Sequence, residues 1–293
     1  TNNLSTPAAA DETQVTGGSA RIEALTSYLA RVTYNYDDRY LLTANFRADG
    51  SAKFDENERW GYFPSVSGAW RISRENFMRD VKVLDELKLR VSHGVVGNQR
   101  PAVAFGSEST LNQNANYTFG NDGTVNRGVV QTEFASEGQK WERNITSSIG
   151  LDATLFRNLD ISADVFYRRT EDILLSVPIP LSTGNAAEPP VINAGEAENR
   201  GYEVAVTYRN ELNDLKYSVN LNFSGFSNEM TFIENGAGIV GGSGDTFSDI
   251  TLTTPGQSIG EFYGLIADGI YQTQGEITNH LFAGASGVQP GDI

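Results

Sequence analysis

The sequence predicts an all-β fold, as part of a large antiparallel transmembrane β-barrel, and three observations support this prediction. About eight segments, each roughly ten residues long, alternate apolar and polar residues with a period of two, which gives a strand one apolar and one polar face. Such segments, once tilted, are long enough to cross a bilayer, whereas strands of soluble proteins average about 5–6 residues. Short turns and long loops alternate between the segments, as they do in outer-membrane barrels.

The first four strands are expected at residues 28–36, 40–49, 66–72 and 87–95. Each combines an apolar face with a polar one. Asp37-Asp38 supplies a tight turn between the first two strands, because short polar residues tolerate the backbone conformations of such turns. Longer connections follow the second strand and the fourth.

The remaining strands are expected at residues 145–155, 159–168, 202–208 and 215–223. Arg157-Asn158 forms the turn of the clearest hairpin, whose carboxylates share one face; that face must be wet, since carboxylates are costly in lipid. Three regions result. We expect residues 1–25 to be a loop leading into the barrel, 26–227 to hold the transmembrane strands, and 228–293 to be a long extracellular loop region that is cut before the final strands.

Aromatic residues gather beside the short turns, where an interfacial girdle of a barrel belongs. They are Tyr34, Tyr36, Tyr40, Phe156, Tyr208 and Tyr217. Strand-enriched aromatics of a soluble sheet are the alternative explanation, but their position at strand ends favours the girdle.

Composition narrows the function. Hydrophobic residues make up 39% of the 293 residues, and no apolar run approaches the roughly 18 residues that a membrane helix requires. The net charge of −15 argues against nucleic acid as a partner, because phosphate binding requires a basic surface. There is no initiator Met and no signal peptide at Thr1, so we expect a portion of a longer product.

No catalytic or metal-binding constellation stands out, and we expect neither an enzyme nor a bound cofactor. The two histidines, His93 on a strand and His280 near the end, are too few for a triad or a His-rich metal site. Pairs such as Asp152 and Asp160 resemble hydrolytic carboxylates, but a polar lumen wall explains them more simply.

Short motifs spread over most of residues 28–275 carry a resemblance. They include Asp38-Arg39-Tyr40-Leu41-Leu42, Arg47-Ala48-Asp49-Gly50-Ser51, Tyr62-Phe63-Pro64-Ser65-Val66, Ala69-Trp70-Arg71-Ile72 and Asn199-Arg200-Gly201-Tyr202-Glu203. In this order and spacing they resemble the barrel of the SusC/RagA-like TonB-dependent transporters of Bacteroidota. The resemblance implies a barrel of about 22 strands in the full protein, with a plugged lumen and long extracellular loops.

The resemblance also implies partners and a location. A SusD-like surface lipoprotein would sit as a lid on the extracellular loops, TonB would deliver energy through an N-terminal region not in this chain, and outer-membrane lipid would surround the barrel. The substrate would be an oligosaccharide or a peptide.

Two sets of residues are candidates for contact with cargo. Polar side chains expected to face the lumen, where they contact either substrate or plug, are Arg31, Asn45, Arg47, Arg90, Asp152, Asp164 and Arg168. Aromatic side chains in or beside the expected outer loops, which contact the ligand or the lid or simply pack the loops, are Trp60, Tyr117, Phe119 and Trp141.

We therefore expect TonB-dependent import of oligomeric nutrients across the outer membrane, without covalent chemistry. Two alternatives stay open at this stage. One is a passive porin-like channel, and the other is a surface adhesin or scaffold built on a barrel.

Overall fold

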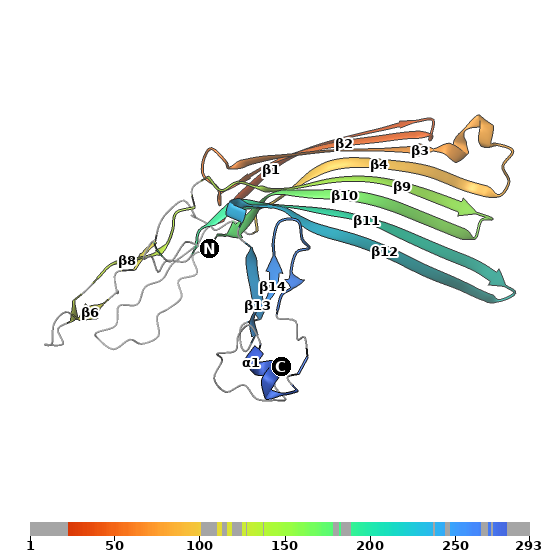
Figure 1. Cartoon of the computed structure of the whole chain (residues 1–293). Coiled ribbons are helices and arrows are strands. Elements are labelled where there is room, and N and C mark those ends of the chain that lie inside the picture. The colour runs from red at the N-terminus through yellow and green to blue at the C-terminus, as the bar shows by residue number, and fades with distance from the viewer. Residues whose placement is uncertain are drawn as a thin grey trace.

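The computed structural model describes residues 23–100, 110–112, 116–118, 125–126, 128–136, 138–177, 182, 189–236, 238–243, 247–264, 269–270 and 272–279. Within them, eight long strands form one curved antiparallel sheet whose spatial order follows the chain (Figure 1). These strands are β1 (Leu25–Tyr36), β2 (Tyr40–Ser51), β3 (Trp60–Arg71), β4 (Leu84–Asn98), β9 (Glu142–Leu155), β10 (Leu159–Ser176), β11 (Val191–Leu212) and β12 (Leu215–Ile233). The predicted all-β antiparallel fold is confirmed, and each expected segment overlaps a different strand.

The strands are longer than the sequence predicted, and most of the extra length lies at the end with the long loops; β4 and β11 also gain three and four residues at the other end. β10, β11 and β12 contain 18, 22 and 19 residues, about twice the 9–11 residues that a tilted strand needs to cross a bilayer. β12 continues to Ile233, past the expected limit of the strand region at residue 227.

At the opposite end, three tight turns and one longer connection join the strands. The longer connection, between β3 and β4, contains the short 3-10 helices η1 (Ile72–Arg74) and η2 (Asn76–Met78). Asp37 and Asp38 both have φ of 52°, as the twist of a tight β-hairpin favours. In the hairpin of β9 and β10 the left-handed residues are Phe156 and Arg157, with φ of 53° and 64°, one position before the expected turn. Leu212 pairs with Leu215, so the last turn is shorter than expected.

One face of the sheet is apolar and exposed. On β12, Val219, Leu221 and Phe223 alternate along this face and are 49%, 52% and 60% exposed. Val165 of β10 and Ile149 of β9 are paired positions on the same face. A face of this kind, repeated on strand after strand, exceeds the few hundred Å² of apolar patch that water-soluble monomers carry. Lipid is the medium that suits it.

Aromatic side chains lie together at the turn end of this outer face, where the sequence predicted them. The ring centroids of Tyr36 and Tyr40 are 6.3 Å apart, and those of Tyr208 and Tyr217 are 6.1 Å apart. At the loop end of the same face, Tyr28 stacks on a neighbouring ring of β3.

Beyond Tyr167 the outer face of β10 becomes charged. A terminal nitrogen of Arg169 lies 2.7 Å from Glu196 of β11, and Arg143 of β9 pairs with Glu171 at 3.2 Å. Unpaired charges are costly in lipid, and charge rows on the outer face therefore mark where the apolar band ends. The strands continue past this level as an extension above the band.

A small hydrophobic cluster fills the loop end of the sheet. It contains Phe54, Phe63, Val95, Trp141 and Leu174. The pairing of β3 with β4 ends at Ser65 and Gly94, and Phe63 lies just past this point. The cluster joins the loop after β2 to the residue before β9 and to the loop end of β10.

Smaller elements follow at the same end (Figure 1). They are the pairs β5 (Thr110–Asn112) with β8 (Val130–Glu133) and β6 (Tyr117–Thr118) with β7 (Val125–Asn126), the three-stranded sheet of β13 (Ile239–Ser243), β14 (Phe247–Thr253) and β15 (Glu261–Phe262), and helix α1 (Gln274–Asn279). The region after residue 228, expected as irregular loop, thus has structure of its own. Among the residues described, no helix has the length and apolar character needed to span a membrane.

Candidate functional site

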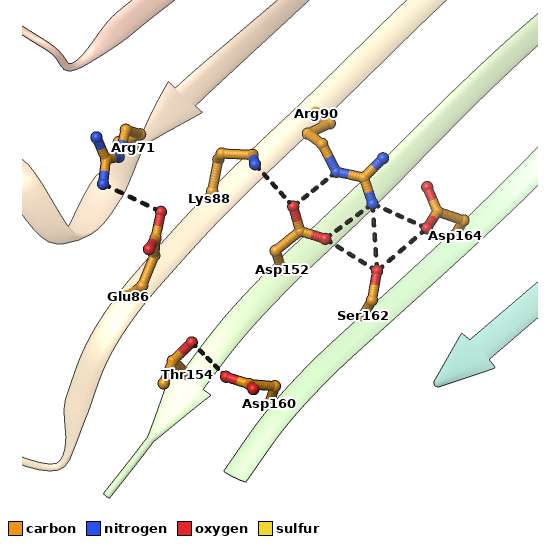
Figure 2. Close-up of polar contacts among 9 residues, drawn as sticks. All are labelled: Arg71, Glu86, Lys88, Arg90, Asp152, Thr154, Asp160, Ser162 and Asp164. Carbon is orange, nitrogen blue, oxygen red and sulfur yellow. Dashed lines mark hydrogen bonds and ion pairs between the residues drawn. The ribbon is translucent and has the colours of Figure 1, made fainter. Parts of the chain in front are cut away.

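The inner face of the sheet carries a network of charged side chains on β4, β9 and β10 (Figure 2). Arg90 Nε donates to a carboxylate oxygen of Asp152 at 2.8 Å, and one of its terminal nitrogens donates to Asp164 at 2.9 Å. Lys88 Nζ lies 3.0 Å from Asp152, and the Ser162 hydroxyl donates to Asp152 at 2.9 Å. Two cations and two carboxylates therefore neutralise each other through charge-assisted hydrogen bonds.

Gly150 allows the Arg90 side chain to cross an intervening strand. Arg90 on β4, Gly150 on β9 and Asp164 on β10 are in register, so the guanidinium group passes over position 150 to reach Asp164. A Cβ at this position would lie 2.1 Å from Asp164 Oδ1 and 2.7 Å from the nearest Arg90 nitrogen. The bridge over three strands in its present geometry therefore depends on the absence of a side chain at position 150.

A second polar row crosses β1, β2 and β3 nearer the loop end. Arg31 Nε donates to Asn45 Oδ1 at 2.6 Å, and Asn45 Nδ2 donates to Ser65 Oγ at 3.1 Å. The three residues are in register with one another and with Gly94 of β4. Gly94 lies about 13 Å along the strand from Arg90, at roughly 3.3 Å per residue. The two polar assemblies are thus separate parts of the inner wall.

The second row lines a half-open cavity of about 880 Å³. Arg47 also lines it, and its Nε donates to buried Asp49 at 2.8 Å. Arg100, which follows β4, contributes to the wall at the loop end. Arg31 and Arg100, unlike Arg47, form no ion pair with any residue that the structure describes.

Glu142 anchors the wall segment that carries Arg100. Glu142 is 5% exposed, and its carboxylate accepts hydrogen bonds from the Leu174 backbone N–H at 2.9 Å and from the side-chain amide of Asn98. Asn98 Oδ1 in turn accepts a hydrogen bond from the backbone N–H of Arg100 at 3.0 Å. A buried carboxylate therefore fixes the backbone at the mouth of the cavity.

The seven polar residues expected in the lumen lie on the polar face. Arg31, Asn45 and Arg47 line the cavity, and Arg90, Asp152 and Asp164 belong to the network. Arg168 lies on the same face of β10, where its Nε donates to Thr146 Oγ1 at 3.3 Å. What they contact in the full protein stays a prediction.

Sequence reasoning missed other residues of the two assemblies. Asp49 and Ser162 lie on the polar face at the same parity as the chosen residues Arg47 and Asp164 of their strands, and Ser65 pairs with the chosen Asn45. Alternation along the strands was the available signal. No alternating pattern identifies Arg100, because it lies after the end of β4. Its place beside the cavity is set by the hydrogen bond from its backbone N–H to Asn98.

The predicted loop aromatic Trp60 lies at the start of β3 and stacks on Tyr28, with ring centroids 5.9 Å apart. Both rings are on the outer, apolar face, since Trp60 pairs with Gly50 and contacts it there. This position does not favour contact with cargo inside the barrel.

The other predicted aromatics differ from Trp60. Trp141 is 6% exposed and packs against Phe54 and Phe63 at centroid distances of 5.2 and 5.4 Å, so the protein itself covers its ring. These contacts agree with loop packing, one of the three roles expected for Trp141, and any contact with ligand or lid stays a prediction. Tyr117 lies in β6, and Phe119 lies outside the described residues.

The carboxylates that resembled a hydrolytic pair have partners. Asp160 accepts a hydrogen bond from Thr154 at 2.8 Å and forms an ion pair with Arg209, while Asp152 belongs to the Arg90 network. The described residues contain no group of three or more acidic or histidine side chains placed to hold a metal ion.

Comparison with known proteins identifies the family. The family model described as TonB dependent receptor-like, beta-barrel matches residues 2–279. The chain belongs to this family. The two-faced sheet is therefore a segment of a TonB-dependent receptor barrel.

Relatives of this receptor barrel carry consistent names. TonB-dependent receptor P3 of Formosa agariphila is 35% identical over 260 residues, which are 85% of this chain and 25% of that protein. TonB-dependent receptor SusC of Bacteroides thetaiotaomicron is 34% identical over 217 residues, 72% of this chain and 21% of that protein. The chain thus spans about a quarter of the length of these relatives. The resemblance to SusC-like transporters is confirmed.

Solved structures agree on the fold of the receptor barrel. A structure of the RagAB peptide transporter matches with a TM-score of 0.68 at 23% identity, over 82% of this chain and 25% of that chain. The RagAB importer in its open-open state matches with a TM-score of 0.65. The proteins matched here are named as receptors, transporters or importers, and not as enzymes.

Proposed function

We propose that this segment belongs to an outer-membrane importer that takes up oligomeric nutrients, glycan or peptide, with energy from TonB. The main observation in support of this proposal is the sheet itself, which combines an exposed apolar outer face with a charged inner wall and a half-open cavity. That combination suits a barrel in lipid through which polar cargo passes. The names of the SusC and RagAB relatives support the same reading.

In this proposal the loop end faces outward. A SusD-like lipoprotein closes over the loops, and cargo captured beneath it moves along the inner wall once the plug is displaced. The wall carries both charge signs together with amides and hydroxyls, which suits hydrogen bonding to a polar oligomer more than steering one ion. The predicted lumen residues contact either cargo or plug, and residues 26–227 and 228–293 supply the membrane strands and the outer loop region.

The experiment is a growth test in the source bacterium. A deletion strain of the gene, a strain lacking TonB function and a strain lacking the proposed SusD-like lipoprotein are compared on panels of oligosaccharides and peptides as sole nutrients. We expect the first two strains to lose growth on the same substrate, and the third to lose part or all of it.

Two results would replace this proposal with the alternatives. Uptake that persists when a protonophore removes the proton-motive force indicates a passive porin-like channel. Unchanged uptake in the deletion strain, together with lost surface attachment, indicates an adhesin or scaffold.

A further inference from the structure

Cations outnumber carboxylates in the cavity of the inner wall. Arg31, Arg47 and Arg100 line it, and Asp49 is the carboxylate among the lining residues. The chain as a whole carries a net charge of −15. The Arg90 network, by contrast, balances two cations with two carboxylates. A local positive excess in an acidic chain favours an anionic ligand.

Hydrogen bonds hold the two arginines that form no ion pair with a described residue. Asn45 accepts from Arg31 Nε, so the guanidinium is held while its two terminal nitrogens remain available to a carboxylate. For Arg100 the backbone is held, by Asn98, which is itself bound to buried Glu142. The Arg31 guanidinium therefore loses less conformational freedom when it binds a ligand.

The rest of the lining favours an aliphatic neighbour for that anionic group. Leu29 and Val96 line the cavity and are 79% and 65% exposed, whereas the rings of Phe63 and Trp141 are each 6% exposed. Exposed aliphatic groups pack against aliphatic side chains. The exposed aromatic ring among the described lining residues is Phe46, which is 47% exposed and stacks with Tyr62 on the outer face. The described inner wall therefore favours aliphatic contact over stacking of a sugar ring. The volume of about 880 Å³ fits a short segment of ligand.

We infer that this cavity is a subsite for the C-terminal end of a peptide, in which Arg31 binds the terminal carboxylate, Arg100 adds positive charge to the wall, and Leu29 and Val96 contact an aliphatic last residue. This inference rests on the proposed import function and narrows its substrate class from oligomers in general to peptides with a free carboxylate.

The test measures binding to the full-length transporter with its lipoprotein, purified in detergent, by calorimetry. The probes are a pool of tetrapeptides that end in leucine, in carboxylate and in amide form. We expect the carboxylate form to bind at least tenfold more tightly than the amide, and added salt to reduce this ratio. Arg31→Gln and Arg100→Gln should each reduce the ratio severalfold, and Arg31→Lys should retain part of it.

The matched control is Arg79→Gln, which removes the same charge from an exposed position at the turn end and should leave the ratio unchanged. Mobility on unboiled gels shows whether each variant is folded. The inference is overturned if the Arg31→Gln protein still folds into a barrel and binds the carboxylate form of the tetrapeptides as much more tightly than the amide form as the unmodified protein does. So does Arg31-dependent binding of tetragalacturonate without peptide binding, which would assign the site to acidic glycans.

A contact between these arginines and a plug carboxylate is the structural rival. It predicts that Arg31→Gln weakens barrel stability while the ratio between acid and amide binding stays the same. Uptake assays distinguish failure of the subsite inference from failure of the proposed import function. TonB-dependent uptake without preference for the carboxylate form overturns only the subsite, whereas absence of any TonB-dependent uptake overturns the import proposal.

Discussion

Gly150 shows how a missing side chain organises the inner wall. Alanine at this position would place a Cβ 2.1 Å from Asp164 Oδ1, so the Arg90 bridge to β10 must break or shift. We expect Gly150→Ala to destabilise the barrel by about 1–3 kcal/mol, the typical cost of losing hydrogen bonds to charged groups. Denaturant unfolding of the full-length protein in lipid vesicles measures this.

The control for Gly150 is Gly68→Ala on β3. A Cβ at Gly68 would meet only Leu41 O, at an ordinary 3.9 Å, so this change should be nearly neutral. Equal loss of stability in the two variants would mean that replacing any strand glycine is destabilising, and that the Arg90 bridge does not account for the effect at position 150.

Glu75 is a titrating group at the turn end, between two short helical turns. Its carboxylate accepts hydrogen bonds from the Tyr40 hydroxyl at 2.7 Å and the Trp70 indole N–H at 3.0 Å. These contacts, that of Tyr40 foremost, lower the pKa of Glu75 below its ordinary value. The ionised form is favoured by folding, so the contribution is present above the unfolded pKa of about 4.3 and is lost as pH falls through the folded pKa.

We therefore expect the stability difference between the unmodified protein and Glu75→Gln to be constant from about pH 7 to pH 5 and to shrink at lower pH. Denaturant midpoints in vesicles at stepped pH values report it. Exposed Glu56→Gln is the control and should show no such trend. A difference that grows toward pH 3 would contradict this account of Glu75.

At the scale of the strand, adjacent residues face different media. Val204 and Ala205 of β11 pair with Ala163 and Ser162 of β10, on the apolar and the polar face respectively. Val204→Arg should cost about 2–4 kcal/mol, since a cation would enter the lipid midplane, and Ala205→Arg should cost less than about 1. Folding equilibria in vesicles measure both, and similar losses in the two variants would contradict the assignment of the faces.

The same alternation explains what the sequence could and could not predict. Within the apolar band, outward residues such as Val165 and Ile149 alternate with polar residues along the strand. Each of the eight strands was located from this alternation of apolar and polar residues. Above the band, Arg169 and Glu196 make the outer face polar as well, so the contrast disappears although the strands continue. The burial of Trp141 depends on residues more than seventy positions away, such as Phe54, which local patterns do not report.

At the scale of the molecule, the described sheet has two open edges. β1 and β12 are its outer strands and do not pair with each other. In lipid their unpaired backbone groups would each be costly, so closure requires further strands. We expect residues 1–293 expressed alone in vesicles to remain sensitive to protease, and the full-length protein to resist it. Protection of the isolated segment would contradict this and indicate closure by self-association.

β10 and β11 extend well above the apolar band. β11 continues for eleven residues from Gly201 back to Val191, roughly 25 Å of height for a strand tilted by about 40°. In the proposed orientation, with the loop end outward, this height sets the opening of the barrel above the membrane surface and not level with it. Under the same proposal, bulky polymeric cargo can reach the opening without first approaching the lipid.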